Sequence, residues 1–266
     1  MSSEVETSRD ISEFERRQTF LDFARHDKHG DTTLCLFSSL HVYLNNTAHS
    51  AAMNMAIDEA LLEQAVVPSI RFYRWHFPAL SIGYFGRFAG VASYAGTRDL
   101  VRRWTGGGIV FHANDLTYSI VIPVNDAAFG ESSTSIYEKV HRALVDALSV
   151  SGKRAVVAGG VDPGAIAVAT RAAVSAGSYS CFANPVRADV MIDGRKVAGA
   201  AQRRTRSGLL QQGSIQGVDP DSGLAERFAE ALSANCSERK MNEEILSRAR
   251  ELAQRKYGTN SWLRRR

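Results

Sequence analysis

The spacing of apolar residues along the chain predicts several amphipathic helices. Between Ser135 and Ser149, the residues Ile136, Val140 and Leu144 fall on one face at the helical period. Another such stretch follows Ser50, which can cap a helix. The same period predicts helices at 51–66, 135–149, 222–234 and 241–256.

Shorter β-branched, aromatic or alternating runs predict strands between these helices. The clearest signal is Asp193-Gly194, a two-residue turn between two alternating runs. Because helices and strands are interspersed and tight turns join several strand pairs, we expect an α+β fold with a mixed, largely antiparallel sheet flanked by helices. The expected strands are 38–44, 70–75, 80–84, 101–105, 109–112, 116–123, 155–157, 188–192, 195–204 and 209–215.

Composition is that of an ordinary globular protein. The 266 residues are 44% hydrophobic and 23% charged, and no apolar run approaches the roughly 18 residues of a membrane helix. Residues 1–33 are polar with one candidate helix at 13–25, so we expect a poorly ordered extension before one domain at 34–266. The extension carries eight acidic and five basic residues, a net charge of −3. Because the whole chain has a net charge of +4, the domain has a net charge of +7. A basic domain suits an acidic partner.

Several common catalytic patterns are missing. The sequence has no G-x-x-x-x-G-K-[ST] phosphate loop, no G-x-S-x-G elbow, no H-E-x-x-H and no paired C-x-x-C. No metal site is therefore expected. The N-terminal residues also lack the apolar region of a secretory signal, so we expect a cytoplasmic protein.

The first candidate site runs from Arg102 to His112, where Arg102 and Arg103 precede the consecutive glycines Gly106–Gly108. Glycines let the backbone approach a ligand closely, and two guanidinium groups can bind a carboxylate or phosphate. The alternative is a glycine-rich hairpin turn with surface arginines.

The second candidate is Lys196, just after the Asp193-Gly194 turn. On a regular strand Lys196 shares a face with Ala198 and Ala200, while Gly199 and Ala201 occupy the other face. A lysine beside small side chains leaves room for a ligand. The alternative is a solvated lysine on an exposed hairpin.

The third candidate is Cys181, on a polar, turn-rich stretch before a strand. A loop cysteine near cations can ionise and act as a nucleophile. The alternative is a small buried hydrophobic residue. That alternative is our interpretation of Cys35, at the start of a strand-like run, and of Cys236, at the end of a helix.

A basic cluster is the fourth feature. It either forms a solvated face or docks an acidic protein, and the absence of interleaved aromatic residues argues against nucleic acid. Its members are Arg195, Lys196, Arg203, Arg204 and Arg206, with Arg264–Arg266 at the end of the chain.

Six segments follow one another at a characteristic spacing between residues 38 and 216: Asn54–Leu61, Ser81–Tyr84, Arg102–His112, Leu116–Ser119, Gly194–Gln202 and Gln212–Ile215. Together they resemble the biotin/lipoate protein ligase catalytic-domain family, in its lipoate-ligase-like octanoyltransferase branch. Two positions depart from the family pattern. Gly86 stands where many members have glutamine, and Ala113 replaces a frequent acidic residue.

The resemblance implies a fold like that of biotin protein ligase and class II aminoacyl-tRNA synthetases. It also implies that the chain attaches lipoate or octanoate to one lysine of a lipoyl domain. Lys196 would contact the acyl carbonyl. The implied substrate-binding residues are Tyr84, Arg102, Arg103, Gly106, Gly107, Gly108, His112, Gly199 and Ala201.

Two activities share this scaffold, and the resemblance favours the first. Octanoyltransferases take octanoate from octanoyl-acyl carrier protein through a cysteine thioester and need no cofactor, whereas lipoate ligases use ATP and Mg to form lipoyl-adenylate. Cys181-Phe182, shortly before Lys196, resembles the transferase arrangement. Cys181 and Lys196 are therefore the implied catalytic residues, and His112 would shape the site or relay a proton.

The implied partners are octanoyl-acyl carrier protein and lipoyl domains, such as glycine cleavage H protein and the acyltransferase subunits of 2-oxoacid dehydrogenases. No nucleic acid or membrane is expected to bind. A third hypothesis is a protein of this fold that binds a ligand without chemistry.

Overall fold

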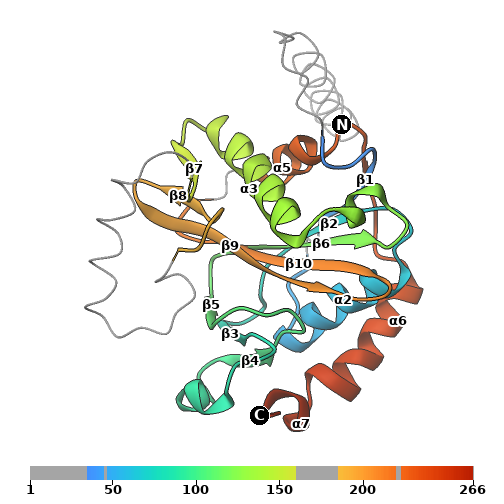
Figure 1. Cartoon of the computed structure of the whole chain (residues 1–266). Coiled ribbons are helices and arrows are strands. Elements are labelled where there is room, and N and C mark those ends of the chain that lie inside the picture. The colour runs from blue at the N-terminus through green and yellow to red at the C-terminus, as the bar shows by residue number, and fades with distance from the viewer. Residues whose placement is uncertain (1–34, 45–46, 160–184, 220–222, 266) are drawn as a thin grey trace, which may run out of the picture. The chain divides into compact units, whose positions relative to one another are not determined.

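The computed structural model describes residues 35–44, 47–159, 185–219 and 223–265 (Figure 1). The expected N-terminal extension with its candidate helix, and Cys181, lie outside these residues.

An eight-stranded sheet forms the centre of the domain (Figure 1). β1 runs parallel to both of its neighbours, and the other neighbouring strands are antiparallel. This arrangement confirms the mixed, largely antiparallel sheet expected from the sequence. In sheet order the strands are β11 (Cys236–Glu238), β1 (Leu40–Leu44), β2 (Ser69–Tyr73), β6 (Leu116–Pro123), β10 (Gly208–Ile215), β9 (Arg195–Arg204), β8 (Val190–Ile192) and β7 (Ala155–Val157).

A smaller sheet carries the glycine segment. β3 (Ala79–Ile82) pairs in parallel with β4 (Asp99–Arg102) and antiparallel with β5 (Val110–His112). The loop from β4 to β5 contains Gly106–Gly108. Two 3-10 turns, Phe88–Gly90 and Ala92–Tyr94, precede β4 and were not expected from the sequence.

Helices cover both faces of the large sheet (Figure 1). α3 (Ser133–Ser149) and α5 (Leu224–Leu232) pack in one hydrophobic cluster, while α2 (Ala51–Gln64) and α6 (Glu243–Leu252) pack in another. The predicted apolar face of α3 is buried in the first cluster. The Ser50 side chain caps α2 by accepting a hydrogen bond from the Met53 amide, as expected.

Three parts of the sequence prediction were wrong in detail. Cys236 begins the short parallel strand β11 and does not end a helix, and both Cys35 and Cys236 are exposed. The register of β8 against β9 shifts between the Val190–Ala198 and Met191–Lys196 pairs, so Val197 is an extra residue in β9 and interrupts the regular alternation predicted around Lys196. The chain also continues past α6 through a π-helical turn, Ala253–Tyr257, into α7 (Asn260–Leu263), which the sequence analysis missed. Within the described residues, no helix combines the length and apolarity that crossing a membrane requires.

Candidate functional site

A pocket lies between the large and the small sheet, and its surface is mainly apolar. About 430 Å³ of space lies within its lining, and part of that space is open to solvent. Five of the predicted substrate-binding residues line it: Arg103, Gly107, His112, Gly199 and Ala201. Its other lining residues are Met55, Tyr73, Trp75, Ser81, Val110, Thr117, Ala200, Gln212, Gly213 and Ser214, none of which the sequence analysis singled out as a site residue.

The glycine loop closes tightly over this pocket. Gly107 has φ +84°, a conformation that favours glycine, and a Cβ there would lie 3.3 Å from the Cβ of Ala201. At Gly83, just after β3, a Cβ would fall 2.0 Å from the Gly107 carbonyl oxygen. Both contacts show that the loop approaches its neighbours closely enough to exclude side chains.

Arg103 holds the loop in this position. Its guanidinium group donates to the carbonyl oxygens of Gly106 at 3.1 Å and Gly108 at 2.8 Å, and to the backbone and hydroxyl oxygens of Ser81. Arg103 is 6% exposed and lines the pocket. Gly106 and Gly108 therefore shape the site through their carbonyl groups and are not themselves part of its lining.

Arg102 does not line the pocket. Its buried guanidinium group donates to the carbonyl oxygens of Gly83, Tyr84, Gly86, Trp262 and Leu263. These bonds fix α7 against the small sheet. Gly86, one of the departures from the family pattern, contributes its carbonyl to this network at 2.7 Å.

A buried hydrogen-bond relay forms part of the pocket wall. Ser81 Oγ lies 2.8 Å from His112 Nε2, and His112 Nδ1 lies 2.7 Å from Asp115 Oδ2. Asp115 also accepts hydrogen bonds from the hydroxyl groups of Thr117 and Ser214. Neither Ser81 nor Asp115 was predicted as a site residue, although the spacing His112-x-x-Asp115 places a carboxylate close to the His112 ring.

The proton positions in this relay follow from the partners. An ionised carboxylate only accepts, so His112 Nδ1 carries the proton and donates to Asp115. Burial lowers the pKa of His112 despite the opposing effect of Asp115, which keeps the ring neutral and its Nε2 an acceptor. Ser81 Oγ accepts a hydrogen bond from Arg103 at 2.5 Å and donates its own proton to His112. The Trp75 ring stacks on His112 at 4.0 Å and fixes the plane of the imidazole.

Lys196 reaches the edge of the pocket from β9. Its ammonium group lies 2.8 Å from Asp189 Oδ2, and the two side chains are 3% and 0% exposed. A Cβ on Gly199 would lie 2.5 Å from Lys196 Cε and 2.6 Å from Nζ. The lysine therefore bends back over Gly199, a lining residue, and occupies the space that a larger side chain would fill.

Asp189 is held by further bonds that the sequence analysis missed. The Tyr137 hydroxyl donates to Asp189 Oδ1 at 2.6 Å, and the Val186 amide donates to Oδ2 at 2.7 Å. The Tyr137 oxygen in turn accepts from the Ala200 amide of β9. This network fixes the carboxylate that pairs with Lys196.

Tyr84 and Cys181 are the remaining predicted site residues. Tyr84 is outside the pocket lining and contacts the guanidinium groups of Arg203 and Arg265. Cys181 lies outside the described residues, so its relation to Lys196 remains a prediction. Among the residues that the structure describes, no three His, Cys, Asp or Glu side chains gather as metal ligands.

The fold and this pocket define a mixed α+β protein with an apolar, glycine-lined pocket beside a buried lysine. The chain belongs to the lipoyl protein ligase A/B catalytic domain family, whose model matches residues 50–256.

Curated relatives include the octanoyltransferase LipM of Oceanobacillus iheyensis, 38% identical over 181 residues, which are 65% of this chain and 62% of the relative. The octanoyltransferase LipM of Symbiobacterium thermophilum is 39% identical over 171 residues, which are 61% of this chain and 60% of the relative. The alignments thus span less than two thirds of the length of these relatives.

Solved structures share the fold. Lipoate-protein ligase A bound with ATP superimposes with a TM-score of 0.64 at 24% identity, covering 84% of this chain and 98% of that chain. A bipartite lipoate protein ligase from Thermoplasma acidophilum, solved in a study that includes its E2 lipoyl domain, gives a TM-score of 0.58 at 23% identity, with 85% and 96% covered.

Proposed function

We propose that this chain is an octanoyltransferase that moves octanoate from octanoyl-acyl carrier protein to a lysine of a lipoyl domain, without ATP. One observation carries the proposal: the ammonium group of Lys196 lies at Gly199, on the edge of an apolar pocket. An acyl chain in this pocket can present its carbonyl group to that ammonium. The names of the curated relatives support the same activity.

In the first step, the Cys181 thiolate attacks the carbonyl carbon of the octanoyl thioester. Negative charge develops on the carbonyl oxygen, where the Lys196 ammonium stabilises it. The bond between the carbonyl carbon and the carrier sulfur breaks, the carrier leaves as a thiolate that takes up a proton, and octanoate is held as a thioester on Cys181.

In the second step, the unprotonated amine of the target lysine attacks this thioester. A carbon–nitrogen bond forms, the bond to the Cys181 sulfur breaks, and the thiolate is regenerated as the amine loses a proton. The paired Asp189 keeps the Lys196 ammonium in place for both steps. Acidic carrier proteins and lipoyl domains suit the net charge of +7 on the domain.

Intact-mass spectrometry tests this proposal directly. The protein is mixed with octanoyl-acyl carrier protein in the absence of ATP, and an octanoyl adduct is expected on the wild type and on Cys35→Ala but not on Cys181→Ala. The adduct should move to an added apo lipoyl domain. An adduct of equal yield on Cys181→Ala would contradict the covalent route, and lipoate-dependent exchange of ATP with pyrophosphate would favour the ligase instead.

A further inference from the structure

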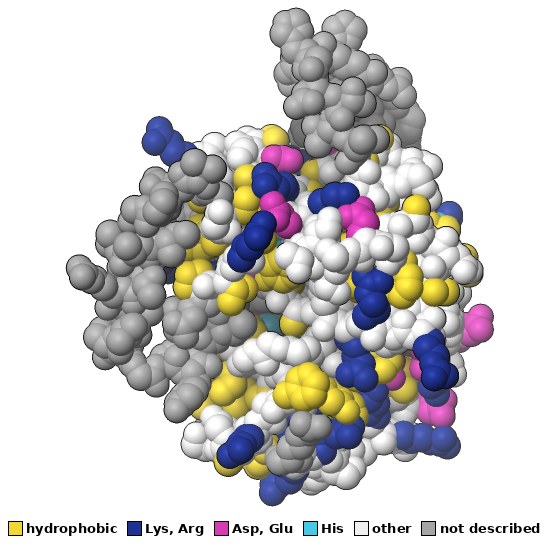
Figure 2. Space-filling model, in the orientation of Figure 1, with side chains coloured by type: hydrophobic (Ala, Val, Ile, Leu, Met, Phe, Trp, Pro, Cys, Tyr) yellow, Lys and Arg dark blue, Asp and Glu magenta, His cyan; other side chains and the backbone are white. Residues whose placement is uncertain are grey.

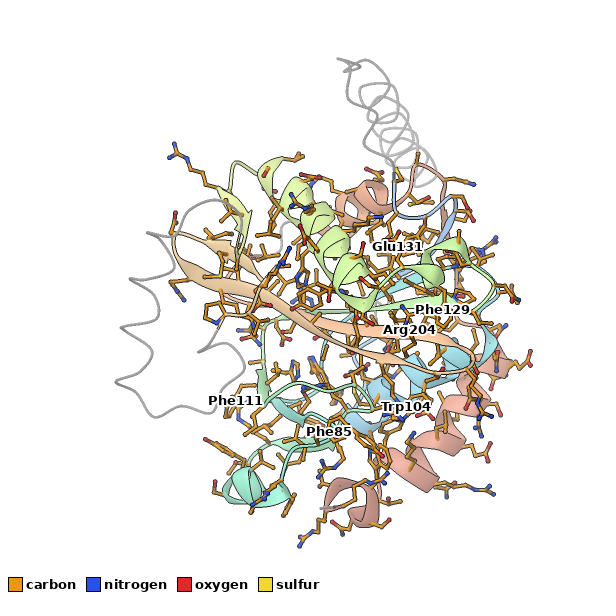
Figure 3. The ribbon with its side chains drawn as sticks, in the orientation of Figure 1. Phe85, Trp104, Phe111, Phe129, Glu131 and Arg204 are labelled. Atoms are coloured by element: carbon orange, nitrogen blue, oxygen red, sulfur yellow. The ribbon has the colours of Figure 1, made fainter. Side chains whose placement is uncertain are left out.

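Outside the pocket, three basic side chains and three aromatic side chains alternate in a closed cycle of contacts. We call this cluster the cation–aromatic ring. Its members come from distant parts of the sequence, so the aromatic residues absent from the basic segment are supplied by the fold. Figure 3 labels Trp104, which lies toward the C-terminal helices, and Figure 2 shows Lys and Arg side chains around hydrophobic ones in the lower half of the same face. The contacts, each from the cation to a ring centroid, are Arg203–Trp104 4.6 Å, Lys256–Trp104 4.3 Å, Lys256–Trp262 4.5 Å, Arg265–Trp262 4.8 Å, Arg265–Tyr84 5.0 Å and Arg203–Tyr84 4.8 Å.

This cluster borders the pocket. Trp104 directly follows Arg103, which lines the pocket. Arg203 lies two residues after Ala201 on β9, and side chains two residues apart in a strand share a face. Because Ala201 also lines the pocket, Arg203 extends the same face beyond it.

The cluster carries more positive charge than its carboxylate balances. Glu59 pairs with Lys256 at 2.6 Å, but no carboxylate among the described residues forms an ion pair with Arg203 or Arg265. Each aromatic ring is shared by two cations, which brings like charges together. Burial and, more weakly, Arg203 lower the pKa of Lys256 even with Glu59 beside it. An anion bound here would relieve this repulsion.

The hydrogen bonding of the Arg203 guanidinium group is incomplete within the described part of the chain. Its Nε is buried without a hydrogen-bond partner in the described part of the chain, and its Nη1 makes only a long bond of 3.4 Å to the Trp104 carbonyl. The described residues therefore satisfy little of the hydrogen-bonding capacity of the Arg203 guanidinium group. Planar guanidinium groups match the oxygen atoms of phosphate and stay charged at every physiological pH.

We propose that the cation–aromatic ring binds the phosphate ester of the acyl donor's prosthetic arm. This inference rests on the proposed transferase function, because it takes the donor to be a carrier protein whose acyl group hangs on phosphopantetheine. The ring then holds the arm outside the pocket while the acyl chain lies inside.

The spacing along β9 fits such an arm. The Lys196 ammonium lies at the level of Gly199, and Arg203 is four residues further along the strand, about 13 Å at the rise of a β-strand. About thirteen bonds separate the thioester sulfur of a pantetheine arm from its phosphorus, which is roughly 15 Å at the dimensions of an extended backbone. A carbonyl group at Lys196 therefore places the phosphate near Arg203.

Binding of the free arm tests this inference without catalysis. The fluorescence of Trp104 and Trp262, confirmed by calorimetry, is followed as 4′-phosphopantetheine or pantetheine is added to the full chain. We expect wild type to bind the phosphorylated compound at least about tenfold more tightly. Arg203→Gln and the exposed Arg265→Gln should bring this ratio close to one. Arg255→Gln serves as the matched control, because Arg255 is 78% exposed and pairs with Glu251.

The possible outcomes separate clearly. A ratio near one in wild type, or an equal loss in Arg203→Gln and Arg255→Gln, would overturn the inference, since the second result would show only general attraction of anions. If AMP binds in an Arg203-dependent way and phosphopantetheine does not, the cation–aromatic ring binds a nucleotide phosphate. That result would overturn the inference that the bound phosphate belongs to the carrier protein. Failure of the transferase itself appears separately, as the absence of any octanoyl adduct in the mass measurement.

Discussion

The Lys196 ammonium group and the Asp189 carboxylate form an ion pair of 2.8 Å in which both side chains are almost completely buried. Asp189 lies just before β8 and Lys196 at the start of β9, so the Asp193-Gly194 turn brings them together. Removing two charges from water is costly unless they are paired and hydrogen-bonded. The additional bonds from Tyr137 and the Val186 amide meet that requirement. The pair therefore holds a charged lysine at the edge of an apolar pocket.

Asp189→Asn should impair both stability and acyl transfer. It leaves the Lys196 charge buried without its carboxylate, and breaking such a pair lowers the free energy of unfolding by about 3 kcal/mol. The lysine is also no longer held at Gly199, so we expect the rate of octanoyl transfer to fall at least about tenfold. Urea unfolding and transfer assays on the same preparation measure the two effects.

The control for this change is Asp193→Asn. Asp193 occupies the exposed turn at φ +49°, a conformation that asparagine also adopts readily. It should leave stability and transfer unchanged. A wild-type transfer rate in Asp189→Asn would contradict the positioning of Lys196 by Asp189.

Gly199→Ala tests the space that Lys196 occupies. The new Cβ would meet Lys196 Cε at 2.5 Å and Asp189 Oδ1 at 3.1 Å, so the flexible end of the lysine must move. We expect a folded protein whose transfer rate is at least about tenfold lower. Gly130→Ala adds the same methyl group where no atom lies within 4 Å and should have no effect. Equal transfer rates in the two variants would show that the lysine position does not matter.

The hydrophobic pattern was enough to predict the sheet and its covering helices. On α3, Ile136, Val140 and Leu144 repeat at the helical period because that face packs on the sheet, and all three are buried. Cys236 shows the limit of this reasoning. The three residues of β11 are too few to show a period, and their strand forms only because β1 offers a parallel partner far away in the sequence.

Some of the residues that line the pocket were predicted, where a backbone constraint or the family resemblance pointed to them. Gly107 and Gly199 were identified as small residues beside a ligand, and the structure gives each a close neighbour that explains the missing side chain. Arg102 and Arg103 were not distinguishable, because which guanidinium group faces the pocket depends on the twist of the loop. Ser81 lies in one of the six segments that carry the resemblance, and Asp189 lies in none of them. Nothing in the sequence assigned a site role to either residue, and only the tertiary fold brings them to His112 and Lys196.

Ser81→Ala should weaken the pocket wall. It removes the donor to His112 Nε2 and an acceptor of Arg103, and leaving such buried groups unpaired costs about 1–3 kcal/mol. Because both neighbours line the pocket, we expect KM for the octanoyl donor to rise as well. Ser233→Ala is a matched comparison, since Ser233 is equally buried and its hydroxyl oxygen accepts from the Asn235 amide at 3.1 Å, and neither residue lines the pocket. Similar KM values in the two variants would argue against a role of the relay in binding.

His141 should make the protein less stable as the pH falls below neutrality. Its Nδ1 lies 2.6 Å from the Ala188 carbonyl oxygen, so that nitrogen carries the proton, and Nε2 accepts from the Tyr118 hydroxyl at 2.9 Å. Burial lowers the pKa of His141 from 6.5 to about 4, although its hydrogen bond to the Ala188 carbonyl acts in the opposite direction. Between these two values the unfolded chain binds a proton that the folded protein does not. The His141 contribution to stability is therefore complete above about pH 6.5, and the free energy of unfolding falls by up to about 3 kcal/mol as the pH approaches 4.

The variant His141→Gln has no titrating group at this position. Urea unfolding at pH 7, 5.5 and 4.5 should therefore show a smaller decrease in the free energy of unfolding than in wild type. If the free energy of unfolding depended on pH equally in wild type and His141→Gln, His141 would have the same pKa in the folded and unfolded states.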